Sequence, residues 1–224
     1  MAEGVPNEEY EAGRPPSWND EGHSGTMRGH VEIAGAGIAG LTAAIALAQR
    51  GWTVQIHERA DRVRAQGSGI ALNKNTQRMM DAIGVLEPTI ADLAPMRRSE
   101  TRSGTGEVLG VRDYARRDQL LEQLTGSSSD PRPSFTQSIE QLEWWPSTIY
   151  FVERGQLLNA LLSVALEWGV ELKTQSEVVR AGLDGTIDLA DGTRHRADLV
   201  IGADGVHSRV RDSLSFPGRR RRLP

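Results

Sequence analysis

Three glycines and one acid have the residue types and the spacing that can bind a nucleotide. Gly35, Gly37 and Gly40 form a Gly-x-Gly-x-x-Gly segment, and Glu58 follows farther along the chain. The first glycine permits a tight turn, the second lets the backbone approach a pyrophosphate, and the third allows close packing of a helix on a strand. A carboxylate at the later position can accept hydrogen bonds from ribose hydroxyls and disfavours a 2′-phosphate. The pattern therefore indicates a dinucleotide site for FAD or NAD rather than NADP.

The elements predicted around this loop are those that such a site requires. His30–Ala34 is a short apolar strand, and Leu41–Arg50 is rich in alanine and leucine, which predicts a helix that ends at Gly51. Trp52–His57 returns to strand, and His57 alternates away from the apolar side chains of that strand, so we expect it at the surface. A strand–helix–strand unit implies a parallel sheet, and the N-terminus of its helix points amide hydrogens at the phosphates.

The rest of the chain alternates helical and extended patterns, which is typical of an α/β fold. Turn dipeptides at Asp184-Gly185 and Asp191-Gly192 predict two further hairpin connections. The other expected elements are helices over Lys74–Ile83, Arg154–Trp168 and Val206–Leu214, strands over Val170–Lys173 and Asp198–Gly202, and a hairpin formed by Ser99–Arg102 and Glu107–Val111.

Composition excludes several classes of function. The chain has 224 residues, a net charge of −4 and a pI near 5.8, which give no electrostatic reason to expect nucleic acid as a partner. It has no cysteine, so a disulfide framework, a thiolate metal site and a cysteine nucleophile are excluded, and a reducing cytoplasm is the expected location. The five histidines are scattered without ligand spacing, so no metal site is expected. No apolar run approaches the ~20 residues that span a bilayer.

Three segments are expected along the chain. Residues 1–29 carry scattered acids, prolines and glycines and are predicted to be a disordered leader, because they cannot bury enough apolar surface to offset the entropy of ordering. Residues 30–214 are expected to form the nucleotide-binding domain. Residues 215–224 end in an arginine run and are predicted to be a disordered basic tail.

Four motifs, taken in order, resemble the class A flavoprotein hydroxylases, the family of p-hydroxybenzoate and salicylate hydroxylases. They are Glu58-Arg59, the Gly67-Ser-Gly-Ile-Ala-Leu-Asn73 segment, the Val152-Glu-Arg154-Gly-Gln-Leu157 segment, and the Asp198-Leu-Val-Ile-Gly-Ala-Asp-Gly-Val-His-Ser-Arg-Val-Arg211 segment. The resemblance covers about residues 30 to 214. Any one motif is unspecific, but the four together in this order are specific.

The resemblance implies an FAD/NAD(P)-binding, Rossmann-like domain with a parallel sheet, together with part of a β-rich substrate lobe near residues 98–112. It implies FAD as cofactor, NAD(P)H as co-substrate, and oxygen transfer from O2 to a small aromatic substrate through a flavin hydroperoxide. Because the cofactor carries the difficult chemistry, no side chain is named as catalytic. The residues expected to bind the cofactor are Gly35, Gly37, Ile38, Ala39, Gly40, Glu58, Arg59, Gly69, Arg154, Asp204 and Gly205.

The sequence departs from the family pattern after Asp204. The family continues to a Gly-Asp motif that contacts the flavin, and no such motif follows here, so we expect a truncated member. A non-catalytic FAD-binding remnant, or a subunit that depends on a partner, therefore stays open, as does another flavoenzyme of the same superfamily. An NAD-dependent dehydrogenase is a further alternative, although the Tyr-x-x-x-Lys pattern of the short-chain type is absent. Neither the substrate nor the oligomeric state can be read from the sequence.

Overall fold

A computed structural model describes residues 28–63, 68–114 and 149–214. The chain divides into two compact units, the first made of residues 1–62 and 165–224 and the second of residues 63–164. Of the predicted leader, residues 1–27 lie outside the described residues, and Gly29 already belongs to a strand. The predicted basic tail, residues 215–224, also lies outside them. Among the described residues, no helix is both long and apolar enough to cross a membrane.

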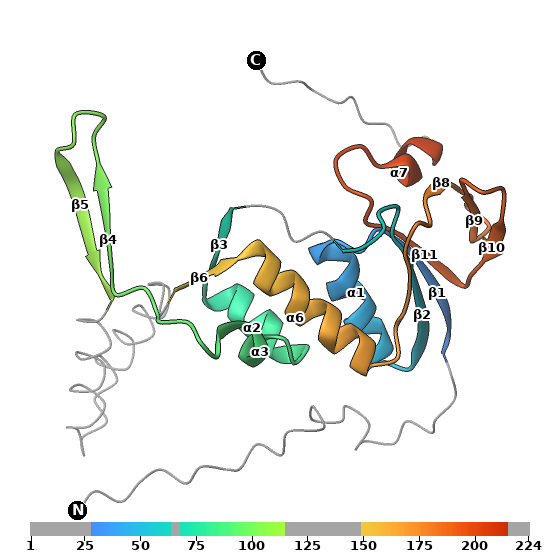
Figure 1. Cartoon of the computed structure of the whole chain (residues 1–224), viewed down its shortest axis with the longest axis horizontal. Helices are drawn as coiled ribbons and strands as arrows, with labels where there is room; N and C mark the ends of the chain where they lie inside the picture. The colour runs from blue at the N-terminus through green and yellow to red at the C-terminus, as the bar shows by residue number, and fades with distance from the viewer. Residues whose placement is uncertain (1–27, 64–67, 115–148, 215–224) are drawn as a thin grey trace, which may run out of the picture. The chain divides into compact units, whose positions relative to one another are not determined.

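The first unit is built on a four-stranded parallel sheet (Figure 1). Its order is β11-β1-β2-β7, with the strands at Gly29–Ala34 (β1), Trp52–His57 (β2), Glu171–Lys173 (β7) and Leu199–Gly202 (β11). Ala34 is in register with His57 on one side and with Gly202 on the other, so the carboxyl ends of three strands meet at one edge. The expected parallel sheet is confirmed.

Helix α1 (Ile38–Ala48) connects β1 to β2 and covers one face of this sheet (Figure 1). It begins three residues earlier than predicted, directly after the glycine loop, and Gly51 follows it at a φ of +80°. Three α1 side chains (Leu41, Ala44 and Ile45) and the strand residues Val31, Ile33 and Ile56 are fully buried. Each of the larger of these side chains contributes about 1.5–3 kcal/mol through burial.

A three-stranded antiparallel sheet forms the second layer of this unit. It runs β10-β9-β8, with strands at Val178–Ala181 (β8), Thr186–Leu189 (β9) and Arg194–Arg196 (β10). Gly185 and Gly192 adopt φ of +83° and +89° in the connections, as the turn dipeptides predict. The small core of this layer joins Val178, Ala181, Ile187 and Leu189 to Ala34 of β1 and to Val210 of helix α7 (Arg209–Ser213).

The described residues of the second unit form two separate antiparallel pairs and three helices. Strand β3 (Gly69–Leu72) pairs with β6 (Tyr150–Glu153), and neither strand was among the expected elements. The helices are α2 (Lys74–Ala82), α3 (Leu86–Ile90) and α6 (Arg154–Glu167), of which α3 was not expected. Within this unit the amide Nε2 of Gln156 on α6 donates to the carbonyl of Thr89 on α3 at 3.0 Å.

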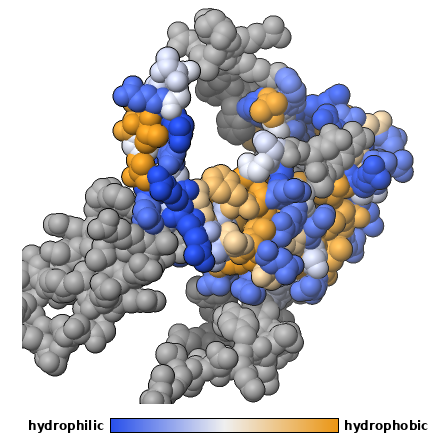
Figure 2. Space-filling model, turned by 60° about the vertical axis from the view of Figure 1, so that its left-hand side comes forward, coloured by the Kyte–Doolittle hydropathy of each residue, from blue (hydrophilic) through white to orange (hydrophobic). Residues whose placement is uncertain are grey.

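The predicted hairpin is present as β4 (Arg98–Arg102) and β5 (Val108–Asp113). Every residue of β5 is exposed, including the apolar residues Val108, Leu109 and Val111. Figure 2 shows apolar residues at the surface of the molecule. An exposed apolar strand is a site at which further polypeptide commonly packs. This is the part of the chain in which the substrate lobe was expected.

Candidate functional site: a dinucleotide pocket

A pocket of about 240 Å³ lies at the carboxyl ends of β1, β2 and β11, where open α/β sheets bind their ligands. Its volume is below the roughly 300–1,000 Å³ of complete small-molecule sites, so it fits one portion of a dinucleotide. We call it the dinucleotide pocket, and all of its lining belongs to the first unit. The lining residues are Ala34, Gly35, Gly37, His57, Glu58, Arg59, Ser176, Glu177, Val178, Ala203, Asp204, Gly205, His207 and Arg209.

The three loop glycines are required for different reasons. Gly35 has a φ of +100°, and a Cβ there would lie 2.5 Å from the carbonyl oxygen of Ala203, while a Cβ on Gly40 would overlap the carbonyl oxygen of Gly35. Both glycines are therefore demanded by the packing of the protein itself. A Cβ on Gly37, in contrast, would meet nothing within 4 Å. The missing side chain at Gly37 leaves open space on the pocket wall, which fits the close approach of a ligand.

The N-terminus of α1 faces this space without a protein cap. Gly37 is the N-cap residue, it provides no side-chain hydrogen bond, and the first turn holds no acidic residue. The first amides of a helix lack partners within the helix, and together with the helix dipole they attract anions. The amides of Ile38, Ala39 and Gly40 are therefore suited to phosphate oxygens.

Glu58 is held by two backbone amides, one in the glycine loop and one just after β2. Its Oε2 accepts a hydrogen bond from the amide of Ala36 at 3.0 Å, and its Oε1 accepts one from the amide of Ala60 at 3.0 Å. These two bonds fix the carboxylate at the end of β2, and each oxygen retains acceptor capacity for a ribose hydroxyl. Arg59 is exposed and lines the same pocket.

Asp204 is first of all a helix-capping residue. Its Oδ2 accepts hydrogen bonds from the amides of Arg209 at 2.6 Å and Val210 at 3.2 Å, while Ser208 Oγ accepts from the Arg211 amide. These caps explain why α7 begins at Arg209 rather than at the predicted Val206. Asp204 Oδ1 is buried and finds no partner among the described residues. A buried oxygen without a partner on a residue that lines the pocket is consistent with a hydrogen bond donated by a bound ligand.

Gly69 and Arg154 lie in the second unit, where the pairing of β3 with β6 brings them together. Gly69 is opposite Glu153, the residue before Arg154, and Arg154 is the exposed first residue of α6. A Cβ on Gly69 would make only an ordinary contact with the carbonyl oxygen of Val152. The protein's own packing therefore does not require a glycine at this position.

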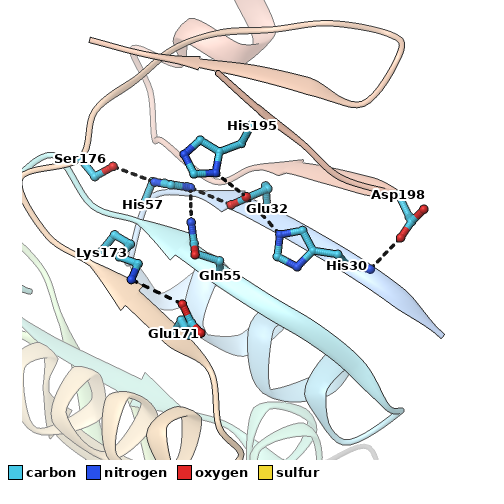
Figure 3. Close-up of polar contacts among 9 residues, drawn as sticks. All are labelled: His30, Glu32, Gln55, His57, Glu171, Lys173, Ser176, His195 and Asp198. Carbon is cyan, nitrogen blue, oxygen red and sulfur yellow. Dashed lines mark hydrogen bonds and ion pairs between the residues drawn. The ribbon is translucent and has the colours of Figure 1, made fainter. Parts of the chain in front are cut away.

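A buried polar cluster that no sequence motif indicated lies on the face of the parallel sheet opposite α1 (Figure 3). Glu32 is 1% exposed, and its carboxylate contacts His57 Nε2 at 2.7 Å, His30 Nε2 at 3.1 Å and His195 Nδ1 at 3.2 Å. We call these four residues the Glu32 cluster. The expectation that His57 lies at the surface is wrong, because the second sheet covers this face and leaves His57 only 2% exposed. In the sequence, the one feature that indicated a polar second face of β1 was the alternation of His30 and Glu32 with Val31 and Ile33.

The Glu32 cluster makes stability depend on pH. Burial opposes ionisation of Glu32, but hydrogen bonds from His57 and His30 outweigh it and hold the pKa of Glu32 below its ordinary value of 4.5. Since the folded-state pKa is lowered, this contribution to stability is complete above pH 4.5 and is lost as the pH falls through the folded-state pKa. We expect the difference in unfolding free energy between wild type and Glu32→Gln, measured with urea, to shrink as the pH is lowered from about 5.5 to about 3.5. A difference that stays constant over this range would contradict the assignment.

The family of the chain is shown by its similarity to known proteins. Residues 28–222 match the family model described as FAD binding domain. The chain belongs to this FAD-binding domain family. FAD is accordingly its cofactor, and the family match supports the flavoprotein interpretation over an NAD-dependent dehydrogenase.

Several FAD-domain relatives are oxygenases. The chain is 38% identical over 199 residues to a 2-heptyl-3-hydroxy-4(1H)-quinolone synthase of Mycobacteroides abscessus, covering 87% of this chain and 45% of that protein. It is 32% identical over 185 residues to a 3-amino-4-hydroxybenzoate 2-monooxygenase of Streptomyces cremeus, covering 82% and 41%. The solved structure of the tetrameric form of 2-methyl-3-hydroxypyridine-5-carboxylic acid oxygenase matches with a TM-score of 0.67 and 32% identity, covering 84% and 42%. The FAD-binding chain thus spans less than half the length of these relatives.

Proposed function

We propose that this chain binds the ADP half of FAD in the dinucleotide pocket and serves an NAD(P)H-dependent monooxygenase reaction on a small aromatic substrate, with O2 as the oxygen source. The observation that carries the proposal is the conjunction of an uncapped helix N-terminus, open space at Gly37 and a fixed carboxylate at Glu58 around one pocket. The oxygenase names of several relatives support the reaction class.

Each part of the dinucleotide has a proposed partner in the pocket. The amides of Ile38, Ala39 and Gly40 would hold the pyrophosphate, which passes over Gly37, and Gly35 shapes the turn beneath it. Glu58 would accept hydrogen bonds from the hydroxyls of the adenosine ribose. The exposed guanidinium of Arg59 would contribute a positive charge beside these groups.

The remaining proposed contacts follow the family resemblance. Asp204 and Gly205 lie on the wall formed by the segment after β11, and Gly205 has a φ of +85° that favours glycine. Gly69 and Arg154, which the second unit holds side by side, are proposed to contact the cofactor by resemblance alone. When bound, FAD supplies the redox chemistry of the reaction, and the protein's own residues bind it, orient it and exclude water.

The first experiment is an absorbance spectrum of the purified chain before and after incubation with FAD and desalting. Retained flavin bands near ~370 and ~450 nm would show that the chain holds the cofactor. Oxidation of NADH or NADPH by the loaded protein, with and without candidate phenols and hydroxypyridines, would then test the monooxygenase reaction. A chain that retains FAD but never consumes NAD(P)H would instead support a binding domain without activity of its own.

Substitution of Glu58 tests its proposed contact with the ribose. We expect Glu58→Ala to weaken FAD binding by about 10- to 100-fold, because hydrogen bonds to a charged group are worth about 1.5–3 kcal/mol. The measurement is a titration followed by quenching of flavin fluorescence. Glu177→Ala is a matched control, because Glu177 lines the same pocket but lies outside the loop and the end of β2. Equal affinities of wild type and Glu58→Ala would contradict the ribose contact.

A further inference from the structure

The Glu32 cluster brings together donor atoms from three strands that are far apart in the sequence (Figure 3). Glu32 lies on β1, His57 on β2 and His195 on β10, the edge strand of the second sheet. Glu32 and His57 share the face of the parallel sheet that the second sheet covers, and His195 is on the same side of its sheet as Ile187, which is 1% exposed. The cluster therefore lies between the two sheets of the first unit.

The donor atoms of these three residues have the spacing of a metal site. One ligand atom from each of Glu32, His57 and His195 lies within 4.8 Å of the other two. Around an ion with bonds of about 2.1 Å, tetrahedral ligands lie roughly 3.4 Å apart, so small side-chain movements would admit an ion. We propose that Glu32, His57 and His195 bind one divalent transition-metal ion, independently of the proposed FAD function.

The surrounding residues hold these ligands as the residues around a metal site do. His57 Nδ1 is 2.7 Å from the hydroxyl oxygen of Ser176, so with an ion bound an Nδ1–H can be donated to Ser176. His57 Nε2, which donates to Glu32 in the absence of an ion, would then give up its proton and bind the metal. Gln55 Nε2 lies 3.2 Å from the same His57 Nε2. His30 approaches Glu32 from the other side, and its own position is fixed by the hydrogen bond from its backbone amide to Asp198.

The donor chemistry selects the class of metal. Two imidazole nitrogens and one carboxylate oxygen, without any thiolate, suit Zn²⁺, Co²⁺, Ni²⁺ or Fe²⁺, whereas Mg²⁺ and Ca²⁺ prefer sites made of oxygen alone. The single carboxylate of Glu32 is buried, and a dication would compensate its charge. The ion would connect the two sheets of the first unit, because His195 belongs to one and Glu32 and His57 to the other.

The test is a titration of the full, untagged chain, freed of metal by a chelator, with Zn²⁺ and with Co²⁺. We expect saturable binding of one ion per chain by calorimetry, and visible Co²⁺ absorption bands typical of mixed nitrogen and oxygen ligands. At a Zn²⁺ concentration about 100-fold above Kd, the melting temperature should rise by roughly 5–10 °C. None of these measurements requires FAD or enzymatic activity.

Two variants separate this site from adventitious binding to histidine. His195→Ala removes a ligand whose side chain is 31% exposed, and we expect it to weaken the affinity for Zn²⁺ by about 10- to 100-fold or more. His207→Ala removes an exposed histidine outside the cluster and should leave the affinity for Zn²⁺ unchanged. Circular dichroism checks that both variants fold, and His195→Cys, which restores a metal ligand, should recover most of the binding.

Acid should weaken Zn²⁺ binding, because protons compete for the imidazole nitrogens and for the carboxylate. The proposal is overturned if the chain shows no saturable binding of Zn²⁺ or Co²⁺. It is equally overturned if His195→Ala and His207→Ala lower the affinity to the same extent, because the bound ion would then not lie in the Glu32 cluster.

Discussion

Replacing Gly37 with aspartate should abolish FAD binding while leaving the protein at least as stable as wild type. A Cβ at this position meets nothing within 4 Å, and the backbone has a φ of −79°, which any residue adopts. Aspartate is among the best N-cap residues, so the free energy of unfolding should stay constant or rise by up to about 1 kcal/mol. The same carboxylate would occupy the first amides of α1 and repel the pyrophosphate. We expect the Kd for FAD to rise by at least about 100-fold, or 2.7 kcal/mol.

The measurement pairs flavin fluorescence titration with urea unfolding of the protein without FAD. Gly104→Asp is the matched control for Gly37→Asp, because Gly104 also faces open space and lies in the β4–β5 turn. Both substitutions change the net charge equally. Unchanged FAD affinity in Gly37→Asp would place the pyrophosphate elsewhere. A loss of stability in Gly37→Asp would show that this glycine is required by the fold.

Gly40→Ala should have the opposite profile and destabilise the protein strongly. By helix propensity alone, alanine in place of glycine within a helix is favourable by about 1 kcal/mol. Here, however, the added Cβ would overlap the carbonyl oxygen of Gly35, which belongs to the backbone and cannot move aside as a flexible side chain can. Such overpacking costs about 1–3 kcal/mol or more, and it separates α1 from β1. Because the overlap is with backbone, we take the upper end of this range, and after the propensity gain we expect a net loss of about 2 kcal/mol in unfolding free energy.

Urea unfolding of the protein without FAD measures this loss, with Gly104→Ala as the control that has open space around the added methyl group. If Gly40→Ala is as stable as wild type, the close contact between α1 and the loop is not part of the fold. Together, the two substitutions separate two roles: we expect Gly37 to be required for FAD binding and Gly40 to be required for the packing of α1 on β1.

Local sequence determined the central elements of both units. Strand β2 occupies the predicted Trp52–His57, and β1, α2, α6 and the β4–β5 hairpin agree with prediction within a few residues. These segments have strong apolar periodicity or unambiguous turn residues, which act over only a few positions. The glycine loop and Glu58 were recognisable for the same reason, because their spacing is fixed by one strand–helix–strand unit.

Tertiary structure decided what no local pattern encodes. Strands β3 and β6 are only four residues long, and they pair across a long separation in sequence that brings Gly69 beside Arg154. His57 and Glu32 are polar residues on the face of the parallel sheet opposite α1, and whether such a face is exposed to solvent depends on what covers it. Because the β8–β10 sheet covers it, Glu32 is buried, and His30, His57 and His195 converge on one carboxylate. Sequence spacing sets local geometry, but only long-range packing determines which residues are buried and which groups contact a buried charge.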